Sequence, residues 1–107
     1  MENLINQFRI CAEERWKYLE LGDSKNGNKY FNELTKIADK LRSESKLEEL
    51  SVLLDDLDDG VKFEAASKLL SINYAKAEEI LVCLTKKKGV LPFTARQTLK
   101  QWKSCNI

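Results

Sequence analysis

The sequence contains no histidine, one proline and four glycines among its 107 residues. Without histidine the chain lacks the commonest zinc ligand, and its three cysteines include no Cys-x-x-Cys pair, so a zinc site is not expected. Neither a phosphate-binding loop nor a nucleophile motif accompanies the carboxylates, lysines and cysteines that remain. The composition therefore favours a protein that is not an enzyme and needs no cofactor.

Long apolar runs and a strong net charge are absent as well. No stretch approaches the roughly 18 apolar residues of a membrane span, and the opening MENLINQFRI lacks the apolar core of a secretory signal. Eighteen basic and seventeen acidic side chains leave a net charge of +1, which gives no overall attraction to nucleic acid or membranes. The cysteines are expected to be buried or idle thiols in a reducing compartment, so we expect a cytoplasmic protein.

Apolar residues recur at spacings of three and four along almost the whole chain, while the alternation typical of strands is missing. This pattern predicts an all-α chain of about six helices joined as antiparallel hairpins. The apolar stripes lie in residues 4–19, 30–41, 47–57, 61–70, 77–84 and 95–102.

Glycines, a proline and capping residues predict where these helices begin and end. Gly22 suits the left-handed turn after the first helix, and Gly27 is expected to delay the start of the second. Ser45 and Glu48 fit a capping box at the start of the third. The signals for the last two helices are Asn73 as an N-cap, Gly89 as a helix end and Pro92 in a first turn.

Part of the sequence matches itself after a shift of thirty residues. The matching pairs include Phe63 with Phe93, Ala65 with Ala95, Leu69 with Leu99, and Leu54 with Leu84. A period of this size predicts stacked helical hairpins, none of which buries its apolar face alone. We expect one domain over residues 1–107, with an atypical capping hairpin at 1–44 and repeat hairpins at 45–71 and 73–103.

The segment LLDDLDDGVKFEAASKLL, residues 53–70, resembles the hairpin of a HEAT or armadillo repeat. Leucines end one helix, an aspartate-rich turn follows, and a valine, a basic residue and paired alanines begin the next. Lys62 stands where that family usually has an arginine, so the bidentate contact of an arginine with a turn aspartate is not expected. The resemblance implies a short right-handed solenoid of three hairpins.

Two further segments, GNKYFNEL at 27–34 and ARQTLKQW at 95–102, extend the likeness over most of the chain. Together the three segments are similar to a small bacterial HEAT-like family. Members of such families are often immunity proteins that accompany secreted toxins. The resemblance therefore implies binding of a toxin as the function.

Four aspartates surround Leu57 in the turn, and several roles are open to them. A calcium loop starting at Asp55 places Gly60 sixth but puts Ala66 at the twelfth position, where a glutamate is required, so calcium is not expected. Asp58 or Asp59 suits the N-cap of the next helix. The remaining aspartates belong either to a solvated turn or to a surface that binds a partner.

The charges are unevenly distributed. Residues 44–64 hold eight acidic and two basic side chains, whereas residues 86–103 hold six basic and no acidic ones. Lysines 86–88 suit a helix C-terminus, where the helix dipole favours positive charge. An acidic patch fits the basic cleft of a nuclease. The residues predicted to bind the partner are Glu48, Glu49, Asp55, Asp56, Asp58, Asp59 and Glu64.

These observations and the resemblance lead to one expected function and two alternatives. We expect a monomeric bacterial immunity protein that binds a cognate toxin, with a nuclease as the expected toxin, and occludes its active site. One alternative is an adaptor that binds several cellular proteins. The other is a nucleic-acid-binding protein of the same fold, which would use Lys100 and Lys103. No membrane partner is expected.

Overall fold

The computed structural model describes residues 3–72, 74–87 and 89–105, and all regular structure in these ranges is helical. The predicted all-α class is therefore confirmed. In chain order the elements are α1 (Leu4–Glu20), α2 (Ser24–Ser43), the 3-10 helix η1 (Leu47–Asp55), α3 (Asp59–Leu69), the short 3-10 helix η2 (Leu70–Ile72), α4 (Ala75–Thr85) and α5 (Val90–Cys105).

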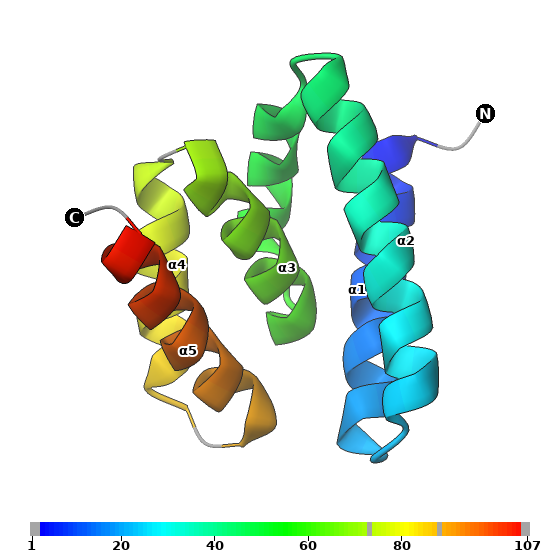
Figure 1. Ribbon diagram of the computed structural model, residues 1–107, viewed down its shortest axis with the longest axis vertical. Helices are drawn as coiled ribbons and strands as arrows, with labels where there is room; N and C mark the ends of the chain where they lie inside the picture. Colours follow the sequence, from blue (N-terminus) through cyan, green and yellow to red (C-terminus); the bar gives the residue numbers. More distant parts are fainter. Residues whose placement is uncertain (1–2, 73, 88, 106–107) are drawn as a thin grey trace.

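The longer helices form three antiparallel pairs, α1 with α2, η1 with α3, and α4 with α5 (Figure 1). Helix α3 lies between the first pair and the last, and it packs against α1 on one side and against α4 and α5 on the other. The lower end of Figure 1 brings together the end of α1 and the beginnings of α3 and α5. A right-handed solenoid stays a prediction.

Burial explains why these segments become helices, because most residues of the predicted apolar stripes face the interior, whereas Leu57 at the end of the third stripe does not. A single core joins all three pairs. Its larger members are Phe8 and Trp16 of α1, Leu34 and Leu41 of α2, Leu50 and Leu54 of η1, Val61, Phe63 and Leu69 of α3, Leu81 and Leu84 of α4, and Leu99 of α5.

The connection between α1 and α2 is only partly as predicted. Gly22 has a φ of +78°, in the left-handed region, which confirms its role after α1. The prediction that Gly27 delays α2 is wrong, because α2 begins at Ser24 with the side chain of Asp23 as its N-cap. A Cβ at Gly27 would lie 2.7 Å from Cδ2 of Leu19, so the glycine lets the two helices approach closely.

The predicted capping box of Ser45 and Glu48 is wrong as well. Ser45 has a φ of +58° and ends α2, with its N–H bonded to the carbonyl of Arg42 at 3.0 Å. A residue in that conformation lacks the extended backbone of an N-cap. Lys46 takes the cap position of η1 without a side-chain hydrogen bond, and the segment that follows is a 3-10 helix instead of an α-helix.

Near α4 and α5 the outcome is also mixed. Pro92 lies in the first turn of α5, as predicted, and it is buried. Helix α4 ends at Thr85, so Gly89 does not close it; Gly89, with a φ of +119°, directly precedes α5 instead. The predicted cap Asn73 lies outside the described residues.

Candidate functional site

The turn between η1 and α3, residues 55–59, is shaped by its own aspartates. An oxygen of Asp58 accepts a hydrogen bond from the N–H of Val61 at 3.0 Å, which confirms Asp58 as the N-cap of α3. An oxygen of Asp56 accepts one from the N–H of Asp58 at 2.9 Å. These two bonds fix the backbone on both sides of Leu57.

The same turn is tied to three other parts of the chain by ion pairs. Asp56 accepts from Nε of Arg9 on α1 at 2.8 Å, and Asp55 pairs with Lys76 on α4 at 3.1 Å. Asp59 pairs with Lys87, after α4, at 2.6 Å. Exposed ion pairs contribute little one by one, but together these pairs orient the turn. All four aspartates therefore have roles inside the molecule.

The protonation of Asp56 reflects these contacts. Partial burial raises the pKa of its carboxyl, but the N–H of Asp58 and the guanidinium of Arg9 lower it by more, so the pKa lies below the ordinary value of 3.8. Asp56 is therefore ionised in the folded protein at neutral pH and keeps its bond to Arg9.

Leu57 occupies the centre of this turn and its surface is 99% exposed. Single exposed leucines are common on protein surfaces. This one differs because the aspartates on both sides hold its backbone in place. The sequence analysis placed Leu57 at the end of the apolar stripe of residues 47–57, and that prediction is wrong, because η1 ends at Asp55 and Leu57 lies in the turn that follows.

A groove of about 650 Å³ opens next to Leu57. Its walls come from α1, from the turn and the start of α3, and from the start of α5. The apolar lining residues are Trp16, Leu57, Val90, Leu91 and Pro92, and the charged ones are Glu13, Lys17, Glu20, Asp58, Asp59 and Lys87. The groove thus combines apolar surface with charged side chains among which carboxylates outnumber ammonium groups.

Glu64 requires a correction, because it was predicted to bind the partner and is only 1% exposed. Its carboxylate accepts hydrogen bonds from Nε1 of Trp16 at 2.8 Å and from Arg15, both on α1. Burial raises the pKa of the Glu64 carboxyl, against the opposing influence of Arg15 and Trp16. Glu64 therefore joins α3 to α1 inside the protein and belongs to no exposed surface.

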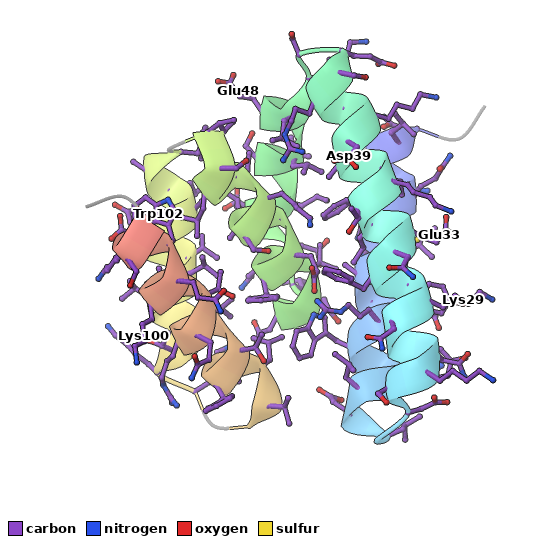
Figure 2. The ribbon with its side chains drawn as sticks, in the orientation of Figure 1. Lys29, Glu33, Asp39, Glu48, Lys100 and Trp102 are labelled. Atoms are coloured by element: carbon purple, nitrogen blue, oxygen red, sulfur yellow. The ribbon has the colours of Figure 1, made fainter. Side chains whose placement is uncertain are left out.

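Glu48 and Glu49 are exposed on η1, but they lie away from the aspartate turn. Figure 2 shows the side chain of Glu48 pointing outward near the connection from α2. At about 2 Å per residue of a 3-10 helix, Glu48 lies roughly 14 Å from the turn. The acidic residues predicted as one surface thus separate into the exposed pair on η1, the turn, and the interior.

The basic segment near the C-terminus also has internal roles. Lys86 occupies the C-cap position of α4, as predicted, and Arg96 donates to the carbonyl of Thr85 at 3.0 Å. Lys100 and Lys103 are exposed on α5, and Figure 2 shows Lys100 on the outer side of that helix. Lys88 lies outside the described residues.

Within residues 3–72, 74–87 and 89–105, no histidine, cysteine, aspartate and glutamate side chains gather in threes or more where they could hold a metal ion. No helix in these ranges has the length and apolar character to cross a membrane. Comparison of the chain with family models, curated proteins and solved structures found no match. The arrangement is thus one of exposed apolar and charged surface around a groove, which suits binding of another macromolecule.

Proposed function

We propose that this protein is a non-enzymatic binding protein, and specifically a monomeric bacterial immunity protein that acts in the cytoplasm. It would bind a cognate toxin, with a nuclease as the proposed toxin, and occlude the toxin's active site. The observation that carries the binding role is the fully exposed Leu57 on a turn whose backbone is already fixed.

A fixed turn supports binding because little conformational entropy is lost when a partner covers it. Full burial of a leucine side chain contributes about 1.5–3 kcal/mol, so Leu57 alone can change affinity by roughly 10- to 150-fold. The groove beside it provides further apolar surface and carboxylates. The toxin as partner rests on the resemblance to HEAT-like immunity proteins, and a basic nuclease cleft fits the acidic turn.

The test is capture of partners from the native host by the tagged full chain, with Leu57→Ser as the variant. Val52→Ser is the matched control, because Val52 is also an exposed apolar residue, at 65%, but lies on η1. We expect one stoichiometric partner with toxin activity that wild type and the control bind and inhibit, and that Leu57→Ser loses.

Other results would contradict the proposal in recognisable ways. Capture of several housekeeping proteins and no toxin would indicate an adaptor. Nucleic acid that co-purifies and is released by salt would indicate the nucleic-acid-binding alternative. Equal capture of one toxin by all three proteins would keep the immunity role but remove Leu57 from the interface.

A further inference from the structure

We propose that the groove between α1 and the start of α5 binds a short basic segment of the partner, in which an arginine or lysine is flanked by apolar side chains. This inference rests on the proposed role as a binding protein and specifies the chemistry of the surface that is bound. Three properties of the groove support it: its charge, its apolar rim and its position.

The charge of the groove is opposite in sign to that of the whole chain. Four carboxylates, on Glu13, Glu20, Asp58 and Asp59, line it together with only two ammonium groups, on Lys17 and Lys87. The whole chain carries a net charge of +1. A local excess of negative charge attracts a cationic segment and repels an acidic one.

An anionic ligand is disfavoured although two helices begin at the groove. The first turn of α3 already has its N–H of Val61 bonded to Asp58 at 3.0 Å, so the helix end is capped from within. Asp59 then adds negative charge in that same first turn. Any anion would have to displace or approach these carboxylates, which costs free energy.

The apolar rim explains why the occupant is not a simple cation. Leu57 and Val90 line the groove with 99% and 58% of their surface exposed, and Phe93 is 57% exposed a few residues further along α5. A metal ion or a small polar cation would leave these side chains in water. Arginine and lysine carry apolar stems below their charged groups, so they match a surface of both kinds.

The position of the groove gives the bound segment a mechanical effect. Its walls come from all three helix pairs, because α1, the turn with the start of α3, and the start of α5 line it. An occupant would touch all three pairs at once. A volume of about 650 Å³ lies within the range of clefts that enclose small ligands, so the groove suits a few residues of extended chain.

The experiment is a titration of the ¹⁵N-labelled full chain, followed by NMR, with two five-residue peptides. One alternates leucine and arginine, and the other alternates leucine and glutamate. We expect the arginine peptide to cause saturable shifts at the amides of Gly60 and Val90 and at the indole N–H of Trp16, all in the groove wall. The glutamate peptide should cause none.

Two matched variants locate the charge effect. Glu13→Gln with Glu20→Gln removes two negative charges from the groove, and it should weaken binding of the arginine peptide by about 3- to 10-fold. Glu48→Gln with Glu49→Gln removes the same charge from exposed sites on η1 and should leave the affinity unchanged. Equal effects of the two variants, equal binding of both peptides, or no shifts with either peptide would overturn the inference.

The inference and the proposed function fail separately. Capture of a toxin that survives Glu13→Gln with Glu20→Gln, together with no peptide binding, would keep the function and reject the groove as the site. Binding of the arginine peptide in the groove without any captured toxin would keep the site and reject the immunity role.

Discussion

Replacement of Glu64 by alanine is expected to destabilise the protein strongly. The carboxylate, 1% exposed, is the acceptor for both Arg15 and the indole N–H of Trp16. The side chain of Arg15 is only 16% exposed. Its guanidinium carbon lies over the rings of Trp16 and Phe31, at 5.1 and 4.7 Å from the ring centroids. Without Glu64, a mostly buried positive charge and a buried donor would lose their partner.

The expected magnitude is about 3–5 kcal/mol, which is typical when one member of a buried ion pair is removed. Domains of this size are stable by only about 5–15 kcal/mol, so a large part of the stability would be lost. Glu64→Gln should cost less, because its amide oxygen still accepts from Trp16. Arg15→Met combined with Glu64→Leu should cost less than Glu64→Ala, about 1–3 kcal/mol, because it removes both charges together and leaves only the indole N–H of Trp16 without its acceptor.

The assay is urea unfolding at pH 7, followed by far-ultraviolet circular dichroism and extrapolated to water. A loss below about 1 kcal/mol for Glu64→Ala would refute the reasoning. So would a double variant that loses the sum of both single losses, because the energetic coupling of the two residues would then be absent.

The pH dependence of stability provides a second test of the pair formed by Arg15 and Glu64. In Arg15→Met, the pKa of Glu64 should rise further above its ordinary value of 4.5, because burial then acts without the nearby guanidinium. A carboxyl whose pKa is raised by folding favours the folded state below its unfolded pKa and loses that contribution as pH rises through the folded pKa. The loss in free energy of unfolding of Arg15→Met relative to wild type should therefore shrink as the pH falls from 7 towards 4.5. A loss that stays constant over this range would contradict the argument.

Three smaller predictions concern glycines and the turn. Gly60→Ala should cost about 1–3 kcal/mol in urea unfolding, because its Cβ would lie 2.8 Å from Cδ1 of Trp16 in the core. Gly27→Ala should stay within about 1 kcal/mol of wild type, because the atoms in the way, Cδ2 and Cγ at 2.7 and 3.1 Å, belong to the flexible side chain of Leu19 and alanine favours the helix; equal losses for both glycine variants would contradict the packing argument. Asp56→Asn should make the melting temperature fall less steeply in acid. Because folding lowers the pKa of Asp56, its ionised carboxylate stabilises the folded state above pH 3.8, and this contribution is lost as the pH falls further. An unchanged dependence of the melting temperature on acidic pH would reject this role.

The fold class was predictable because burial follows the apolar period directly. Phe8, Ala12 and Trp16 were expected on one stripe of a helix, and all three are buried in α1. The residues at which helices begin and end were harder to predict. Gly27 has poor helix propensity, but a close contact with Leu19 outweighs it, and such a contact between two helices leaves no local mark in the sequence.

The candidate site was predictable only in part. The N-cap at Asp58 follows from its position before an apolar run, whereas Lys76, Arg9 and Lys87, which bind Asp55, Asp56 and Asp59, lie 21, 47 and 28 residues away from them. No local pattern identifies pairs that distant. The burial of Glu64 did have a signal, because its sequence neighbours Phe63, Ala65 and Ala66 are apolar or small and are buried with it in α3. A carboxylate on such a buried stretch of helix needs an internal partner.

The pairing of helices with their neighbours in the chain has a consequence for the order of folding. Because α1 packs with α2, η1 with α3, and α4 with α5, most contacts close short loops, and we expect folding within microseconds to milliseconds. The bonds from Arg9 to Asp56 and from Arg15 to Glu64 span 47 and 49 residues. During synthesis the first hairpin therefore emerges well before its acceptors on the middle pair. We expect its apolar face to dock onto α3 only after the middle pair has been synthesised.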